Sequence, residues 1–105
     1  MSKFNHTPGP WEAIDRKIFR TGSTYRIGNT DSNIAGYSEE CSNARLIAAA
    51  PDMLDALIES YEIVRDLPCE CDDYHGSTCG LHKWERDLRG TIKKATGMSI
   101  DEVLK

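Results

Sequence analysis

Long apolar runs are missing from this chain: none approaches the roughly 20 residues that a membrane-spanning helix needs. The N-terminal segment MSKFNHTPGPW has no apolar signal core, so we expect a cytosolic protein. A net charge of −4 argues against nonspecific binding to nucleic acid, because neutralising phosphates needs a basic surface. Glycine-rich phosphate loops, GxSxG elbows and HExxH motifs are also absent, and we predict that the protein is not an enzyme.

Cysteine is scarce, with four among 105 residues, and in a cytosolic chain it is reduced or metal-bound rather than paired in disulfides. Three of the four cluster with two histidines, which gives five candidate zinc ligands within 14 residues: Cys69, Cys71, His75, Cys79 and His82. Thiolates and imidazoles suit a structural, tetrahedral zinc held by the three cysteines and one histidine. The alternative is a connector between helices that is merely rich in thiol and polar residues.

The strongest periodicity predicts an amphipathic helix over Pro51–Asp66, with an acidic opposite face. Its apolar residues recur at steps of three and four: Met53, Leu54, Leu57, Ile58, Tyr61 and Val64. Proline suits the first turn of a helix, where its missing N–H is not needed. A shorter, alanine-rich helix over Asn43–Ala49, with Ser42 as its N-cap and Ala50 as a joint, completes a helical region at 42–66.

A last long helix is expected at 80–96, with one apolar stripe: Leu81, Trp84, Leu88, Ile92 and Ala95. Its other side is basic, which complements the acidic face of the preceding helix in an antiparallel pair. Gly97 suits the position that ends this helix, and Ser99 with Glu102 matches a capping box for a terminal turn at 99–105. Amphipathic helices on so short a chain favour a homo-oligomer, with Trp84 and Leu88 as candidate interface residues.

Strands are expected at 11–40, after a loose arm at 1–10. The pattern predicts three or four antiparallel strands: Trp11–Arg16, a hairpin over Lys17–Gly28 that turns at Thr21-Gly22-Ser23, and Ile34–Ser38 after a turn at Asn29–Asn33. The fold class is therefore α+β in a single domain, 1–105. A small N-terminal sheet packs on two C-terminal helices, which a Cys/His-rich connector at 67–80 joins.

Several residues in the first half suit an anionic ligand with a planar base. Asn43 and Arg45 open the expected first helix, where free N–H groups and the helix dipole favour an anion. Arg20 and Arg26 lie on opposite arms of the hairpin and are expected to reach the same region. Three aromatic residues are candidates to stack on a base: Tyr25, Tyr37 and Trp11.

A plainer interpretation competes with this one. Arg45 pairs with Glu39 or Glu40, Arg20 and Arg26 face solvent, and Trp11 is a core anchor. The sequence leaves both interpretations open.

Two segments resemble a widespread group of small proteins encoded by tailed bacteriophages and prophages: HTPGPWEA, His6–Ala13, and NARLIAAAPDMLDAL, Asn43–Leu57. The resemblance implies an accessory protein in the host cytoplasm. In outline, the expected sheet followed by two helices is similar to the oligomeric phage sponges that inhibit Thoeris and CBASS signalling.

Such a protein would bind and sequester a cyclic or ADP-ribose-type immune-signalling nucleotide without turning it over. The alternative is a zinc-stabilised module that binds and inhibits a host protein through its cysteine-rich connector and basic helix. A DNA-binding regulator is a third class, and it conflicts with the acidic net charge.

Overall fold

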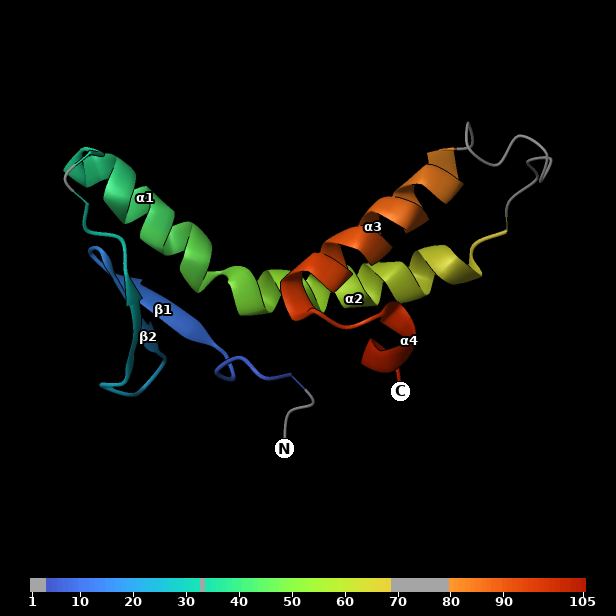
Figure 1. Cartoon of the computed structure of the whole chain (residues 1–105), viewed down its shortest axis with the longest axis horizontal. Helices are drawn as coiled ribbons and strands as arrows, with labels where there is room; N and C mark the ends of the chain where they lie inside the picture. Colours follow the sequence, from blue (N-terminus) through green and yellow to red (C-terminus); the bar gives the residue numbers. More distant parts are fainter. Residues whose placement is uncertain (1–3, 33, 69–79) are drawn as a thin grey trace. The chain divides into compact units, whose positions relative to one another are not determined.

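A computed structural model describes residues 4–32, 34–68 and 80–105 of the chain. The chain divides into two compact units, Met1–Met53 and Leu54–Lys105. The first holds a three-stranded sheet and a helix, and the second consists of helices (Figure 1). The predicted α+β class, with an N-terminal antiparallel sheet followed by helices, is confirmed.

The sheet consists of β1 (Trp11–Ile14), β2 (Lys17–Arg20) and β3 (Arg26–Asn29) in the order β1-β2-β3, with both pairs antiparallel. Gly22 supplies the positive φ, +78°, that the connection between β2 and β3 needs, as its position in the sequence predicts. The prediction of a fourth strand at Ile34–Ser38 is wrong, because a helix begins at Tyr37.

Helix α1 (Tyr37–Ala48) is longer than the helix expected at Asn43–Ala49. Gly36 is its N-cap residue, so Ser42 lies inside the helix and the predicted cap at Ser42 is wrong. The acidic residues Glu39 and Glu40 occupy the first turn, where negative charge is favourable next to the helix dipole.

The core of the first unit lies between the sheet and α1, which covers one sheet face (Figure 1). Ile18, Ala44 and Ala48 form its buried centre, and three half-buried residues pack around them: Trp11, Ala13 and Ile27. Alanines at a four-residue step let the helix approach the strands closely. Side chains alternate along β1, so Ile14 projects from the opposite face and is 54% exposed.

Helix α2 (Ala50–Asp66) follows α1 after a one-residue joint at Ala49, one position before the expected joint at Ala50. Pro51 occupies the first turn of α2, as predicted, and is buried. The backbone of Gly9 lies directly against it: a Cβ added to Gly9 would be 2.7 Å from the Cβ of Pro51. The segments HTPGPW and NARLIAAAPD therefore touch at this point.

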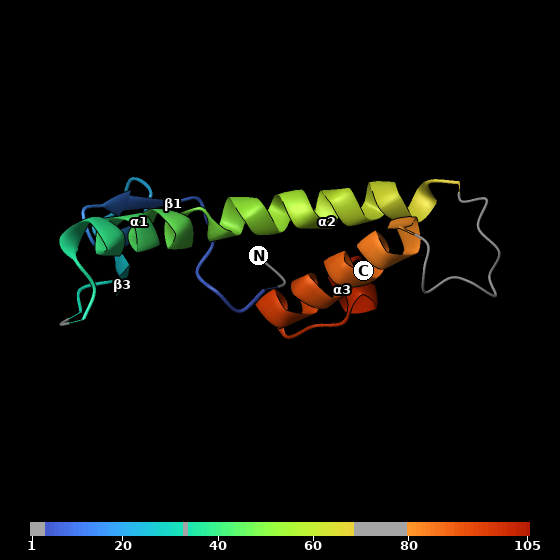
Figure 2. The same ribbon diagram turned by 90° about the horizontal axis from the view of Figure 1, so that it is seen from above.

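The second unit contains the rest of α2, α3 (Gly80–Thr96) and α4 (Ile100–Val103). α3 runs in the direction opposite to α2 (Figures 1 and 2). Buried apolar side chains come from all three helices: Leu54, Tyr61, Val64, Leu88, Ile92, Ile100 and Val103. Leu88 is thus a core residue and the expectation that it forms an interface is wrong for this fold, whereas Trp84 is 50% exposed.

The end of α3 and the start of α4 have the local structures that the sequence predicts. Gly97, with φ at +72°, ends the helix and its N–H donates to the carbonyl of Lys93 at 2.7 Å. Ser99 and Glu102 form the predicted capping box at the start of α4. Within the described residues, none of the helices combines the length and the apolar composition that crossing a bilayer needs.

Candidate functional site

A shallow hollow opens beside β1, next to the end of α1 and the start of α2, within the first unit. Its volume is about 360 Å³, and seven residues line it: Trp11, Glu12, Ala13, Arg45, Ala48, Ala49 and Asp52. It brings together two of the predicted ligand-binding residues, Trp11 and Arg45, which are 34 positions apart in the sequence. We call it the Trp11–Arg45 hollow.

Trp11 is held firmly at one side of this hollow. Its Nε1–H donates to the carbonyl of Thr7 at 3.1 Å, and its ring meets the ring of His6 edge-on, with centroids 6.2 Å apart. Phe4 stacks on the His6 ring, with ring centroids 5.3 Å apart. Trp11 also packs on the Ile18 core. It therefore anchors the core, as the plainer interpretation predicts, and still lines the hollow.

Arg45 lies in the last turn of α1 and is exposed. The pairing with Glu39 or Glu40 that the plainer interpretation predicts does not form: Glu40 binds Arg16 instead, with Nη1 and Oε1 3.2 Å apart. Among the described residues, no ion pair or side-chain hydrogen bond is recorded for the Arg45 guanidinium. The charge balance of the hollow is mixed, because Glu12 and Asp52 also line it.

Asn43 and Arg45 do not act together at a helix N-terminus. The helix begins at Tyr37, so both residues lie past its middle, and the predicted anion site at their amides is wrong. Residues two positions apart on a helix do not face each other. Accordingly, Asn43 is exposed but is not part of the lining of the hollow.

The strand register separates the other two arginines. Arg20 pairs directly with Trp11, which places both side chains on the sheet face that α1 covers. Arg26 pairs with Phe19, the neighbour of Arg20, so it projects from the opposite face. The expectation that Arg20 and Arg26 reach one region is therefore wrong. Tyr25, 60% exposed, lies in the connection that precedes β3.

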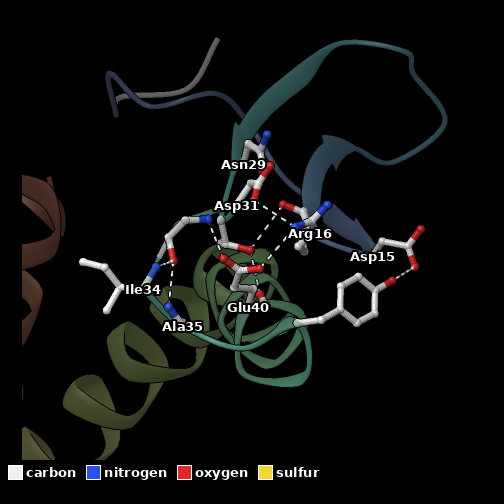
Figure 3. A network of polar contacts seen from close by, with 10 residues as sticks. Asp15, Arg16, Asn29, Asp31, Ile34, Ala35 and Glu40 are labelled. Atoms are coloured by element: carbon white, nitrogen blue, oxygen red, sulfur yellow. Dashed lines mark hydrogen bonds and ion pairs between the residues drawn. The ribbon is translucent and has the colours of Figure 1, made fainter.

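A network of polar contacts at the start of α1 is not predicted from the sequence (Figure 3). Glu40 is buried, 2% exposed, and accepts hydrogen bonds from Arg16 and from the backbone N–H of Ser32. Arg16 also pairs with Asp31 at 2.8 Å, and the Thr30 hydroxyl donates to the Glu40 carbonyl at 2.6 Å. These contacts tie the β1–β2 turn, the segment after β3 and α1 together.

A second hollow, of about 330 Å³, adjoins this network and is lined by residues of the sheet, of its connections and of the start of α1. Eight residues line it: Ile14, Asp15, Arg16, Lys17, Phe19, Asn29, Asp31 and Tyr37. We call it the Asp15 hollow. Asp15 has a φ of +56°, which non-glycine residues rarely adopt, and it accepts a hydrogen bond from the Tyr37 hydroxyl at 3.0 Å. The Arg16 guanidinium lies over the Tyr37 ring, 5.3 Å from its centroid.

The network shifts two pKa values. The hydrogen bond from Ser32, and then the guanidinium of Arg16, hold the pKa of Glu40 below its usual value, against the opposing effect of burial. Hydrogen bonding with Cys41, and then with Asp15, raises the pKa of Tyr37 to about 12. Glu40 is therefore ionised at physiological pH, which lets it pair with the Arg16 guanidinium, and Tyr37 is neutral and donates its hydroxyl proton to Asp15.

Most of the predicted zinc ligands lie outside the described residues. Cys69, Cys71, His75 and Cys79 are outside the described residues, and His82 is half-buried in the first turn of α3. The described residues contain no group of three or more metal-ligating side chains. The fourth cysteine, Cys41, is a buried free thiol in α1.

The small sheet-and-helix fold and its two hollows belong to a phage protein. A family model described as Salmonella phage P22 protein Y8K6 matches residues 1–99, and the chain belongs to this family. The resemblance to small phage proteins is thereby confirmed. No curated protein matches the chain, and no solved structure matches it.

Proposed function

We propose that this phage protein acts by binding and not by catalysis. Its ligand would be a host cyclic or ADP-ribose-type immune-signalling nucleotide, which it sequesters in the host cytoplasm. One observation carries the proposal: Arg45, without a recorded partner among the described residues, shares a hollow with Trp11. An aromatic ring that stacks on a base and a guanidinium that binds phosphate are the two elements that recognition of a nucleotide needs.

The dimensions and charges of the Trp11–Arg45 hollow limit how a nucleotide would bind. Its volume of about 360 Å³ is at the small end of the range for small-molecule sites. One base and its ribose would fill it, and the phosphates would lie at the rim beside Arg45. Glu12 and Asp52 would accept hydrogen bonds from ribose hydroxyls and repel a phosphate placed deeper in the hollow.

Isothermal titration with cyclic ADP-ribose and with a cyclic dinucleotide tests this proposal. Arg45→Ala should weaken binding by more than about tenfold, because a charge-assisted contact to phosphate is lost. Arg26→Ala is the matched control, since Arg26 projects from the other sheet face, and it should leave the affinity unchanged. Asp52→Asn should tighten binding of an anion. Equal affinities for the Arg45 and Arg26 variants would remove the assignment.

A second candidate function is inhibition of a host protein, favoured by two exposed residues beside the Asp15 hollow, Ile14 of β1 and Tyr37 at the start of α1. Ile14 and Tyr37 are 54% and 58% exposed beside the Asp15 hollow. A patch of this kind suits a protein surface better than a nucleotide. Ile14→Asp should abolish a stoichiometric host complex that Arg45→Ala leaves intact. The reverse result would favour the nucleotide.

We also propose that Cys69, Cys71 and Cys79 hold a structural zinc together with His75 or His82. The sequence spacing supports this proposal. Purified protein should contain one zinc per chain by elemental analysis, and Cys79→Ser should remove it, whereas Cys41→Ser should not because Cys41 is buried in α1. Protein that takes up no zinc after incubation with the metal would exclude the site.

A further inference from the structure

Helix α2 carries a second strip, of small and apolar residues, that its own unit does not bury. The strip consists of residues at steps of four, three and four: Ala56, Ser60, Ile63 and Leu67. Ile63 is 58% exposed, and Leu67, directly after the helix end, is 44% exposed. This strip is distinct from the buried side of the helix, which carries Leu54, Tyr61 and Val64. Steps of this kind form the seam of packed helix pairs.

Helix α3 exposes a strip of small and apolar residues as well. Trp84 is 50% exposed, and Thr91 and Ala95, seven and eleven positions later, are exposed on the same side of the helix. Tryptophan at half exposure is typical of interface anchors, which bury a large area when a partner binds. Both long helices of the second unit therefore present apolar surface outward.

The two helices carry net charges of opposite sign, and among the described residues these charges form no ion pair between the helices. α2 carries five acidic residues and one basic residue, and α3 carries five basic and two acidic. The recorded ion pairs of these helices join neighbours on one helix: Arg65 with Asp66 at 3.4 Å, and Lys83 with Asp87 at 2.8 Å. Among the described residues, no lysine or arginine of α3 forms an ion pair with a carboxylate of α2.

We infer that a second copy of this chain covers these strips. α2 of one copy packs against α3 of the other, and two-fold symmetry repeats the contact, which gives an antiparallel bundle of four helices. Charge selects this arrangement: α2 on α2 would oppose acidic surfaces and α3 on α3 would oppose basic ones, whereas α2 on α3 pairs them. A closed two-fold contact also buries the strips of α2 and α3 in both copies.

Sedimentation equilibrium of the full chain, from about 1 to 100 µM, tests this inference. We expect a dimer, with Ile63→Asp and Trp84→Asp each raising its dissociation constant by about tenfold or more. Leu46→Asp is the matched control: Leu46 is 62% exposed on α1, outside the strips, and should leave the constant unchanged. Circular dichroism checks that each variant is folded. A wild-type monomer at 100 µM, or equal effects at Leu46 and Ile63, would overturn the inference.

A charge exchange tests the pairing of α2 with α3 directly. The charges nearest the two strips are exchanged in two variants, Glu59→Lys/Asp66→Lys on α2 and Lys83→Glu/Lys94→Glu on α3. Each variant should weaken the homodimer by about tenfold, because it opposes like charges in both contacts. Mixing the two variants restores opposite charges in both contacts, so a heterodimer should form with near wild-type affinity, more weakly as salt rises. Failure to form it while each variant is folded would refute the arrangement, whichever ligand the first unit binds.

Discussion

Gly9→Ala tests whether the contact between the two sequence motifs supports the first unit. The added Cβ would lie 2.7 Å from the Cβ and 3.2 Å from the Cγ of Pro51, where ordinary contact begins at 3.4 Å. The chain must therefore shift by several tenths of an ångström at a buried helix start. Overpacking of this kind costs about 1–3 kcal/mol, and a stiffer unfolded chain offsets about 0.4–1 kcal/mol of it. The expected net loss is about 1–2 kcal/mol.

Urea denaturation in a Trp84→Phe background measures this loss, because Trp11 is then the sole tryptophan and reports on the first unit. A slope of about 1 kcal/mol per molar urea converts the loss into a midpoint lower by about 1–2 M. Gly28→Ala is the control: its Cβ would meet the Ile18 Cδ1 at an ordinary 3.8 Å, so stability should hold or rise. Pro51→Gly should suppress most of the cost of Gly9→Ala, since it removes the colliding atoms. A Gly9→Ala midpoint equal to that of Gly28→Ala would refute the reasoning.

Two further predictions concern pH. The pKa of Glu40 is lowered from 4.5 in the folded chain, so its contribution to stability is full above 4.5 and is lost as the pH falls through the folded value. The melting temperature of wild type should therefore fall more steeply than that of Glu40→Gln on acidification, and parallel curves would contradict this. The pKa of Tyr37 is raised from 10.0 to about 12, so its contribution is full below 10.0 and is lost as the pH rises through about 12. Absorbance titration should show a late phase that Tyr37→Phe removes; an unchanged titration curve would count against the hydrogen bonds that hold this hydroxyl.

The features that the sequence predicts correctly depend on neighbouring residues. Gly22 and Gly97 have positive φ because the turn and the helix end at those positions need it. Ser99 and Glu102 are three residues apart, so their capping box is local. The apolar steps along α2 likewise predict its buried side, Leu54, Tyr61 and Val64, from the helical period alone.

The features that it misses depend on distant residues. Glu40 is a charged residue that local reasoning leaves in solvent, and it is buried because Arg16, 24 positions earlier, binds it. That contact lies in the first turn of α1, and because α1 begins at Tyr37, Asn43 and Arg45 lie away from the helix start. The register of β2 and β3, with its irregularity between Ile18 and Phe19, decides the faces of the arginines in the same way.

Packing explains why some residues of the two motifs occur at their positions, but it does not explain all of them. Gly9 and Pro51 form the contact between the motifs, Ala44 and Ala48 fill the core, and each is buried or closely approached by its neighbours. Arg45 lies between those alanines in the sequence, yet it is exposed and lines the hollow. The helix dipole favours a cation in the last turn of α1, but only by about 0.3–1 kcal/mol at an exposed position, and lysine would meet that need as well. A ligand that needs a planar guanidinium at the rim of the hollow would give a reason for arginine in particular, and the proposed function depends on this reason.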